Sequence, residues 1–260
     1  MTLTQKNYYT KENNYISNSK IGDFLKDKAY FKAKHIDCTI VEPCTPAMRF
    51  GLMVDTLLTE GITVFNKKFQ IKVLKKDNPG LFAEQAMSDN IEIVAPQLIE
   101  KTSALVNAIY LQDAYKDIKD YDTQIILQQD FKQPINGFSG LCGMLDFLKI
   151  EGTTAHIVDL KTSSSVDPFK YKYKAEDFGY FRQMAMYSSL VASNFPHVTD
   201  ITCSHLVAES LAPYRMNTFI FDPSRMESEL IKLYDVITQV TSEKKWAHNN
   251  ISWKDAEVLN

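Results

Sequence analysis

Apolar residues recur three or four positions apart in several stretches of the chain, which is the spacing of one helical face. The first such stretch carries Ile21, Phe24 and Leu25 behind serines that can cap a helix. Thr45 followed by Pro46 is a typical helix start. The pattern predicts further helices over residues 46–60, 79–118, 180–192 and 224–246, with Pro96 starting a second helix or kinking a long one.

Shorter runs rich in apolar and β-branched residues predict strands between these helices. They cover residues 66–74, 124–129, 140–162, 201–208 and 215–221, the third of them as a hairpin. Helices and strands therefore follow one another in a mixed α/β plan, and no internal repeat is visible.

The hairpin turn falls at Gly152 and Thr153, where glycine can take the positive φ that a tight turn requires. A turn at this position sets the register of both arms. It puts Asp146 directly opposite Asp159, with Lys161 on the same face, because strand side chains alternate with a period of two.

Two carboxylates on neighbouring strands conflict unless a cation joins them. At about 5 Å they repel by roughly 3 kcal/mol at an effective dielectric of about 20. Oxygen ligands at this spacing suit Mg²⁺ or Mn²⁺, and Lys161 could orient a nucleophilic water or stabilise charge on a phosphate. An isolated Asp-x-Lys is usually solvated, but the longer arrangement of Gly143, Asp146, turn and Asp159-Leu160-Lys161 favours a metal-dependent nuclease site.

The helix predicted over residues 46–60 carries a carboxylate among its apolar positions. Asp55 lies three residues from both Leu52 and Leu58, on the face that also carries Met48. Burying an unpaired carboxylate costs several kcal/mol. Asp55 is therefore either a ligand of the site or a residue held by a cap or an ion pair.

Composition limits the remaining possibilities. The chain has 260 residues, is 45% apolar and has a formal net charge of −3, so any DNA contact must be local rather than a basic coat. Two lysine-rich segments could provide it, 67–76 and the alternation of lysines with aromatics over 169–174. Solvated lysines on a loop would explain either segment without any contact to DNA.

No apolar run is long enough for a membrane span and no leader is visible, so we expect a cytoplasmic protein, in the host cytoplasm if phage-encoded. The polar residues 1–15 predict a mobile arm. Four scattered cysteines fit reduced thiols better than disulfides or an iron–sulfur cluster.

These features in this order resemble the PD-(D/E)xK nuclease superfamily, and within it the branch of RecB-type nuclease domains and phage exodeoxyribonuclease VIII. The resemblance covers about residues 15–222. Its motifs here are Ser17-Asn-Ser19-Lys-Ile21, Gly51-Leu-Met-Val-Asp55, Gly143-Met-Leu-Asp146, Asp159-Leu-Lys161 and Gln183-Met-Ala-Met-Tyr187. In the second motif the family usually has histidine where this chain has Asp55.

The resemblance implies a central mixed β-sheet flanked by helices, with an N-terminal helical elaboration. Residues 16–260 would form one domain, with a helical part over 16–120, a catalytic sheet core over 121–222 and a C-terminal helix over 223–248. The activity implied is that of a Mg²⁺- or Mn²⁺-dependent deoxyribonuclease of phage recombination. Such an enzyme digests DNA from its ends, forms an oligomer and works with a single-strand annealing protein.

The residue patterns and the resemblance together assign residues to roles. Asp146 and Asp159 would hold the metal with the carbonyl of Leu160, and Lys161 and Gln183 would serve catalysis. Asp55 is a further candidate ligand, which the resemblance alone does not establish because the family usually has histidine there. DNA would contact Thr162, Ser163 and Tyr187, with Tyr187 alternatively packed beneath Gln183. The lysine-rich segment adds Lys170, Lys172 and Lys174 to the expected DNA contacts. Two other functions remain open, an endonuclease on the same core and a catalytically weak DNA-binding or partner-binding module.

Overall fold

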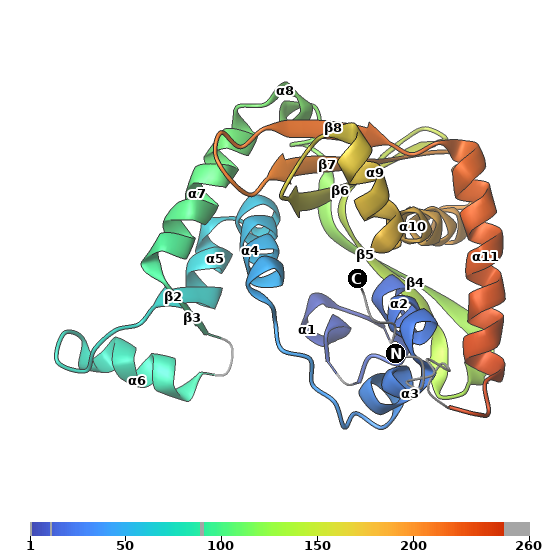
Figure 1. The fold of residues 1–260 in the computed structure, drawn as a ribbon, viewed down its shortest axis with the longest axis horizontal. Helices are drawn as coiled ribbons and strands as arrows, with labels where there is room; N and C mark the ends of the chain where they lie inside the picture. The colour runs from blue at the N-terminus through green and yellow to red at the C-terminus, as the bar shows by residue number, and fades with distance from the viewer. Residues whose placement is uncertain (1, 11, 89–90, 247–260) are drawn as a thin grey trace, which may run out of the picture.

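The computed structural model describes residues 2–10, 12–88 and 91–246. A six-stranded mixed sheet forms the centre of this described part, with helices on both faces (Figure 1). Its strands are β1 (Tyr15–Ile16), β4 (Asp122–Ile135), β5 (Phe138–Glu151), β6 (Thr154–Ser163), β7 (Asp200–Glu209) and β8 (Met216–Ile220).

Strand β5 organises the sheet because it pairs with three other strands. Antiparallel β4 runs along one edge of β5. The other edge is shared by parallel β1, beside Gly140 and Leu141, and by antiparallel β6, which begins to pair at Phe147. Within the described residues, positions 142–146 of β5 have no strand partner on this second edge. The sheet continues from β6 to parallel β7 and antiparallel β8.

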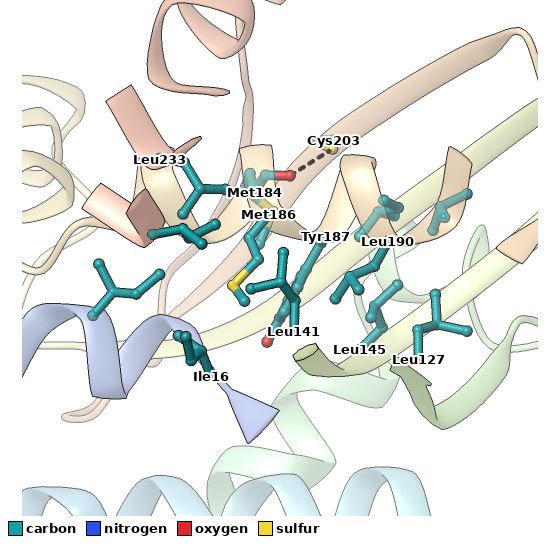
Figure 2. Packing of buried hydrophobic residues seen from close by; sticks show 14 of the residues in the cluster. Ile16, Leu127, Leu141, Leu145, Met184, Met186, Tyr187, Leu190, Cys203 and Leu233 are labelled. Carbon is teal, nitrogen blue, oxygen red and sulfur yellow. Dashed lines mark hydrogen bonds between the residues drawn. The ribbon is translucent and has the colours of Figure 1, made fainter. Parts of the chain in front are cut away.

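One face of the sheet is covered by helices from both ends of the chain. They are α2 (Asn18–Lys26), α3 (Lys28–Phe31) with the π-helical turn Lys32–Ile36, α10 (Tyr180–Asn194) and α11 (Pro223–Ser242). Figure 2 shows Met184, Met186 and Leu190 of α10 packed over Leu141 and Leu145 of β5. This core holds the opening helix and α10 at fixed positions above β5.

The opposite face is covered by helices from the first half of the chain. They are α4 (Pro46–Asp55) with the π-helical turn Thr56–Glu60, α5 (Ile62–Lys68), α7 (Pro96–Tyr110) and α8 (Asp113–Lys116). Their core contacts Phe147, Val158 and Leu206 of the sheet. Beyond them, α6 (Pro79–Met87) and the parallel pair β2 (Phe69–Ile71) and β3 (Glu92–Val94) extend away from α11 (Figure 1).

The predicted hairpin register is confirmed. Glu151 pairs with Thr154 across the turn, Phe147 pairs with Val158 further along, and Gly152 has a φ of +60°. The predicted helices around residues 18–26, 46–60, 96–110 and 180–192 are also present. Thr45 caps α4 through the Met48 amide, as expected.

Other expectations were wrong. Residues 62–68 form helix α5, so only Phe69–Ile71 of the predicted strand 66–74 is extended, and the helical prediction over 79–118 missed β3. The final helix α11 (Pro223–Ser242), capped by Asp222, ends at Ser242 rather than at residue 246. Met48 is 56% exposed, so the apolar face of α4 is formed instead by Phe50, Met53 and Val54.

The predicted mobile arm over residues 1–15 packs against the sheet in its described part. Leu3 and Tyr15 are buried with Cys142 of β5, and the Leu3 amide donates to Oε1 of Gln128 at 2.9 Å. At the other end, α11 stops at Ser242, and residues 247 and 248 of the predicted final helix lie outside the described residues. No helix in the described part is long and apolar enough to cross a membrane.

Candidate active site

The candidate site lies where β6 separates from β5. Phe147 and Val158 form the last pair of the hairpin ladder, and Asp146 and Asp159 follow immediately. Instead of standing over the next rung, Asp146 accepts a hydrogen bond through Oδ2 from the Leu160 amide at 2.8 Å. The carboxylate thus fills the fork between the two strands.

A local irregularity in the sheet turns Asp146 into this position. Leu145 packs in the α10 core and Phe147 in the α4 and α7 core, although residues two apart in a regular strand share a face. Opposite them on β4, Gln124 has a φ of +54° and is skipped in the ladder. Side-chain alternation therefore breaks at Asp146, which a simple hairpin model does not anticipate.

Asp159 lies deepest in the site and is held by neighbours on two elements. It is 2% exposed and forms an ion pair with Lys161. The Gln183 amide of α10 donates to its Oδ1 at 3.2 Å. Lys161 lies over the ring of Tyr180, with Nζ 4.9 Å from the ring centroid, so its ammonium is fixed beside the carboxylates.

Gln183 and Tyr187 share one face of α10, as their spacing of four predicted. The Gln183 amide donates to the Tyr187 hydroxyl at 2.9 Å, and this hydroxyl donates to the Met144 carbonyl at 2.9 Å. Tyr187 is only 7% exposed. It therefore packs beneath Gln183 and supports the site, and the alternative role in contacting DNA does not fit its burial.

Asp55 reaches the same fork from α4 on the other side of the sheet. Gln124 donates to both of its carboxylate oxygens at 3.2 Å. Burial, together with the nearby charges of Asp159 and Glu60, raises the pKa of Asp55 to about 6. The structure thus brings Asp55 into the cluster and also pairs it with Gln124.

The electrostatics of the cluster favour a bound cation. Burial, and then the charges of Asp159 and Asp55, raise the pKa of Asp146 well above its usual value. Burial also raises the pKa of Asp159, although Lys161 opposes the shift. Burial disfavours the charge on Lys161, but the carboxylates of Asp159 and Asp146 outweigh it and raise its pKa. Three carboxylates thus surround one ammonium group.

The donor set fits Mg²⁺ or Mn²⁺ without forming a closed cage. No group of three or more His, Cys, Asp or Glu side chains in the described part is arranged to hold a metal ion. Mg²⁺ needs only one or two carboxylates, since it keeps several waters. Asp146 and Asp159 could supply these. The Leu160 carbonyl faces the same fork, because the N–H and C=O of one strand residue point to the same side.

The residues predicted to contact DNA differ in how exposed they are. Lys170, Lys172 and Lys174 lie on α9 (Pro168–Asp177), a helix that the sequence prediction missed because only Tyr171 and Ala175 form its apolar face. Lys170 and Lys172 are exposed. At 100° per residue, Lys170 and Lys174 project on one side of the helix and Lys172 on the other.

Thr162 and Ser163, the last two residues of β6, have structural partners. Ser163 is 3% exposed, and its hydroxyl donates to the Ser165 carbonyl at 2.8 Å and accepts from Lys174 Nζ at 3.2 Å. The expected DNA contact by Ser163 therefore does not fit its burial. Thr162 is half-buried and lies against Gly51 of α4, where an added Cβ would stand 3.4 Å from its hydroxyl oxygen.

A cavity of about 750 Å³ opens beside the site, between the N-terminal residues, α2 and β5. Its wall includes Met144 and Gln183, together with Tyr9, Ser17 and Lys34. Sequence patterns did not predict this cavity. They also did not single out Gln124, Tyr180 or His205, which contact Asp55, Lys161 and Asp159 respectively. Tyr171 lies in the lysine–aromatic segment predicted to contact DNA, but it is buried against His205.

Comparison with known proteins agrees with this geometry. A family model described as "PDDEXK-like domain of unknown function (DUF3799)" matches residues 17–257. A search of curated proteins found no significant match.

Among solved structures, a crystal structure of a protein from Eubacterium rectale described as a "Putative exonuclease" matches with a TM-score of 0.66 at 16% sequence identity. The match covers 100% of this chain and 95% of the other, and it shows a shared fold. The structure of SSO0001 is more distant, with a TM-score of 0.32 at 11% identity over 83% of this chain and 85% of the other, and it carries no argument.

Proposed function

Because the chain belongs to the DUF3799 family of PDDEXK-like domains, and so to the PD-(D/E)xK superfamily, we propose that it is a Mg²⁺- or Mn²⁺-dependent deoxyribonuclease that digests DNA from its ends. The observation that carries this proposal is the fork between β5 and β6, where Asp146, Asp159 and Lys161 meet. We further propose that it acts in phage or prophage recombination together with a single-strand annealing protein.

Asp146 and Asp159 would hold the metal, with the Leu160 carbonyl and Asp55 as further oxygen donors. A divalent metal at this position supplies positive charge for the phosphate and lowers the pKa of water. Lys161 provides a fixed ammonium beside the carboxylates, where it can orient the attacking water or neutralise charge on the phosphate. Gln183 holds Asp159 through its amide and keeps that carboxylate directed into the fork.

Digestion from an end is supported by the cavity next to Gln183. Its volume of about 750 Å³ offers room for a terminal nucleotide beside the fork. The exposed lysines of α9 follow β6 directly and could contact the backbone behind it. The description of the Eubacterium rectale protein as a "Putative exonuclease" is in keeping with this proposal.

End-labelled linear duplex and covalently closed circular DNA, each incubated with the protein in Mg²⁺ and then in EDTA, test the proposal. We expect loss of the linear duplex in Mg²⁺, survival of the closed circles, and no cleavage of either in EDTA. Linearised circles would favour an endonuclease on the same core. Binding of DNA without cleavage, in Mg²⁺ and in Mn²⁺, would favour a catalytically weak binding module.

A further inference from the structure

A buried histidine stands next to Asp159 on the neighbouring strand. His205 of β7 is the register partner of Asp159 in the parallel β6–β7 ladder, and it is fully buried. Its Nδ1 lies 2.7 Å from the Tyr171 hydroxyl. Its Nε2 lies 3.9 Å from Oδ2 of Asp159 and has no hydrogen-bond partner in the described part of the chain.

The surroundings of the ring determine which nitrogen carries the proton. A neutral imidazole carries one N–H, on Nδ1 or on Nε2. With a proton on Nδ1, the Nε2 lone pair would face a carboxylate, and the Tyr171 hydrogen would lose its acceptor. With the proton on Nε2, Tyr171 donates to Nδ1 and Nε2–H points toward Asp159. The second tautomer satisfies more groups.

We infer that His205 is a positioning residue, in which the Nε2–H group, fixed by Tyr171, orients the carboxylate of Asp159 toward a divalent cation. The inference rests on the proposed function, because it concerns the metal ligand of that site. A distance of 3.9 Å is beyond a hydrogen bond, so the contact in this structure is an attraction between a dipole and a charge. Residues behind a metal ligand typically change metal affinity by 10–100-fold when they are replaced.

Tyr171 ties this arrangement to α9. Its ring stacks on Phe219 with centroids 4.4 Å apart and an interplanar angle of 18°, so the aromatic packing can survive loss of the hydroxyl. Tyr171→Phe therefore removes the group that fixes the tautomer while keeping the shape of the core. Because Tyr171 is 3% exposed, the substitution leaves the exposed surface around the fork unchanged.

The test compares Mn²⁺ binding by calorimetry in the full chain and in Tyr171→Phe, His205→Leu and His205→Gln. Glutamine carries an N–H at about the reach of Nε2, whereas leucine has none. Leu233→Ala, which empties space in the core on α11, a helix that supplies no residue of the site, is the control for a general loss of stability. Thermal melts give the folded fraction of each variant, and kcat and KM are measured on linear duplex.

We expect Tyr171→Phe and His205→Leu to weaken Mn²⁺ binding at least tenfold and to lower kcat more than they change KM, while His205→Gln recovers most of the affinity. Leu233→Ala should melt earlier yet bind Mn²⁺ normally. Wild-type affinity in folded Tyr171→Phe would overturn the inference even if His205→Leu does not fold. A wild-type protein that neither binds Mn²⁺ nor cleaves DNA would overturn the proposed function as well.

Discussion

At the scale of single residues, Asp159 combines the highest burial in the fork with a raised pKa. Asp159→Asn keeps the shape and the hydrogen bond from Gln183 but removes a charged metal ligand. We expect cleavage to fall by several orders of magnitude, because the metal loses a charged ligand and the phosphate then loses the positive charge of the metal. Near-normal cleavage of linear duplex, at matched metal and DNA concentrations, would contradict the site assignment.

The same substitution has a structural cost that can be separated from catalysis. Lys161 would lose its nearest ion-pair partner, although Asp146 remains close. Asp159→Asn should therefore melt within a few degrees of the wild type, and far-UV circular dichroism should show an unchanged fold. Calorimetric titration with Mg²⁺ then shows whether lost activity follows lost metal binding.

Asp55 makes stability depend on pH in a direction opposite to that of an ordinary paired carboxylate. Its folded pKa of about 6 lies above the value near 4 of an unfolded aspartate. Between these values the folded state binds more protons, so the free energy of unfolding falls as pH rises through this window and levels off above it. A shift of about two units corresponds to at most about 3 kcal/mol.

Asp55→Asn should reduce this dependence. In EDTA, the wild type should melt several degrees lower at pH 7.5 than at pH 5, whereas the variant should show a clearly smaller difference. The difference that remains comes from Asp146 and Asp159, whose pKa values are also raised. With excess Mg²⁺, the wild type should be stabilised most above pH 6, since the metal binds the ionised carboxylates. Parallel melting curves for wild type and variant in EDTA would exclude Asp55 from the coupled cluster.

At the scale of elements, the sequence predicted the parts of the site that depend on local rules. A turn at Gly152 fixes the register of the hairpin, and a spacing of four fixes the shared face of Gln183 and Tyr187. The break in alternation at Asp146 could not be predicted, because it depends on the Gln124 backbone across the sheet. The partners of Asp159 on β7 were missed because parallel pairing joins residues about 46 positions apart, such as Asp159 and His205.

Gly143, three residues before Asp146, is a glycine for a steric reason. A Cβ at Gly143 would lie 2.7 Å from Cε1 of Tyr187 and 3.0 Å from Leu190, so α10 can approach β5 only over a glycine. Gly143→Ala should displace Tyr187 and with it Gln183. Overpacking of this kind costs about 1–3 kcal/mol, and cleavage should fall more than the folded fraction does.

Gly80→Ala is the matched control for this substitution. Gly80 lies in the first turn of α6, where the nearest atom to an added Cβ is a side-chain oxygen at 3.7 Å. Alanine should be tolerated there, or even stabilise the helix by up to about 1 kcal/mol. Equal effects of the two alanines on the melting temperature and on cleavage would show that the approach of α10 to β5 is not critical.

At the scale of the whole molecule, three distant segments converge on the fork. The helix α4 brings Asp55 from one face of the sheet, α10 brings Gln183 from the other, and the hairpin provides Asp146, Asp159 and Lys161. The order of these segments was visible in the sequence through the family motifs. The motifs also predicted that these residues share one site, but not how they meet, because that depends on the gap along β5 between β1 and β6.

The net charge of −3 gives the chain little attraction for DNA, which matters for the processive digestion expected of the proposed exonuclease. Most non-specific affinity comes from neutralising phosphates, so a single subunit should dissociate readily. We expect a closed oligomer that encloses the duplex and presents the exposed lysines of α9 to it, since many weak contacts then act together. Light scattering should give a mass well above 29.7 kDa, and digestion should continue after a heparin trap is added.

Replacing Lys170 and Lys172 by alanine tests the part that α9 plays in this retention. Both side chains are exposed on α9, so the variant should fold normally and form the same oligomer. The slope of log binding constant against log salt concentration should become shallower by up to about two units. The length of DNA digested per binding event should shorten. Lys116→Ala on α8 removes one charge from another exposed helix and should leave both quantities unchanged. A monomer that digests long tracts in the presence of heparin would contradict enclosure, because a weakly bound single subunit has no other means of remaining on its substrate.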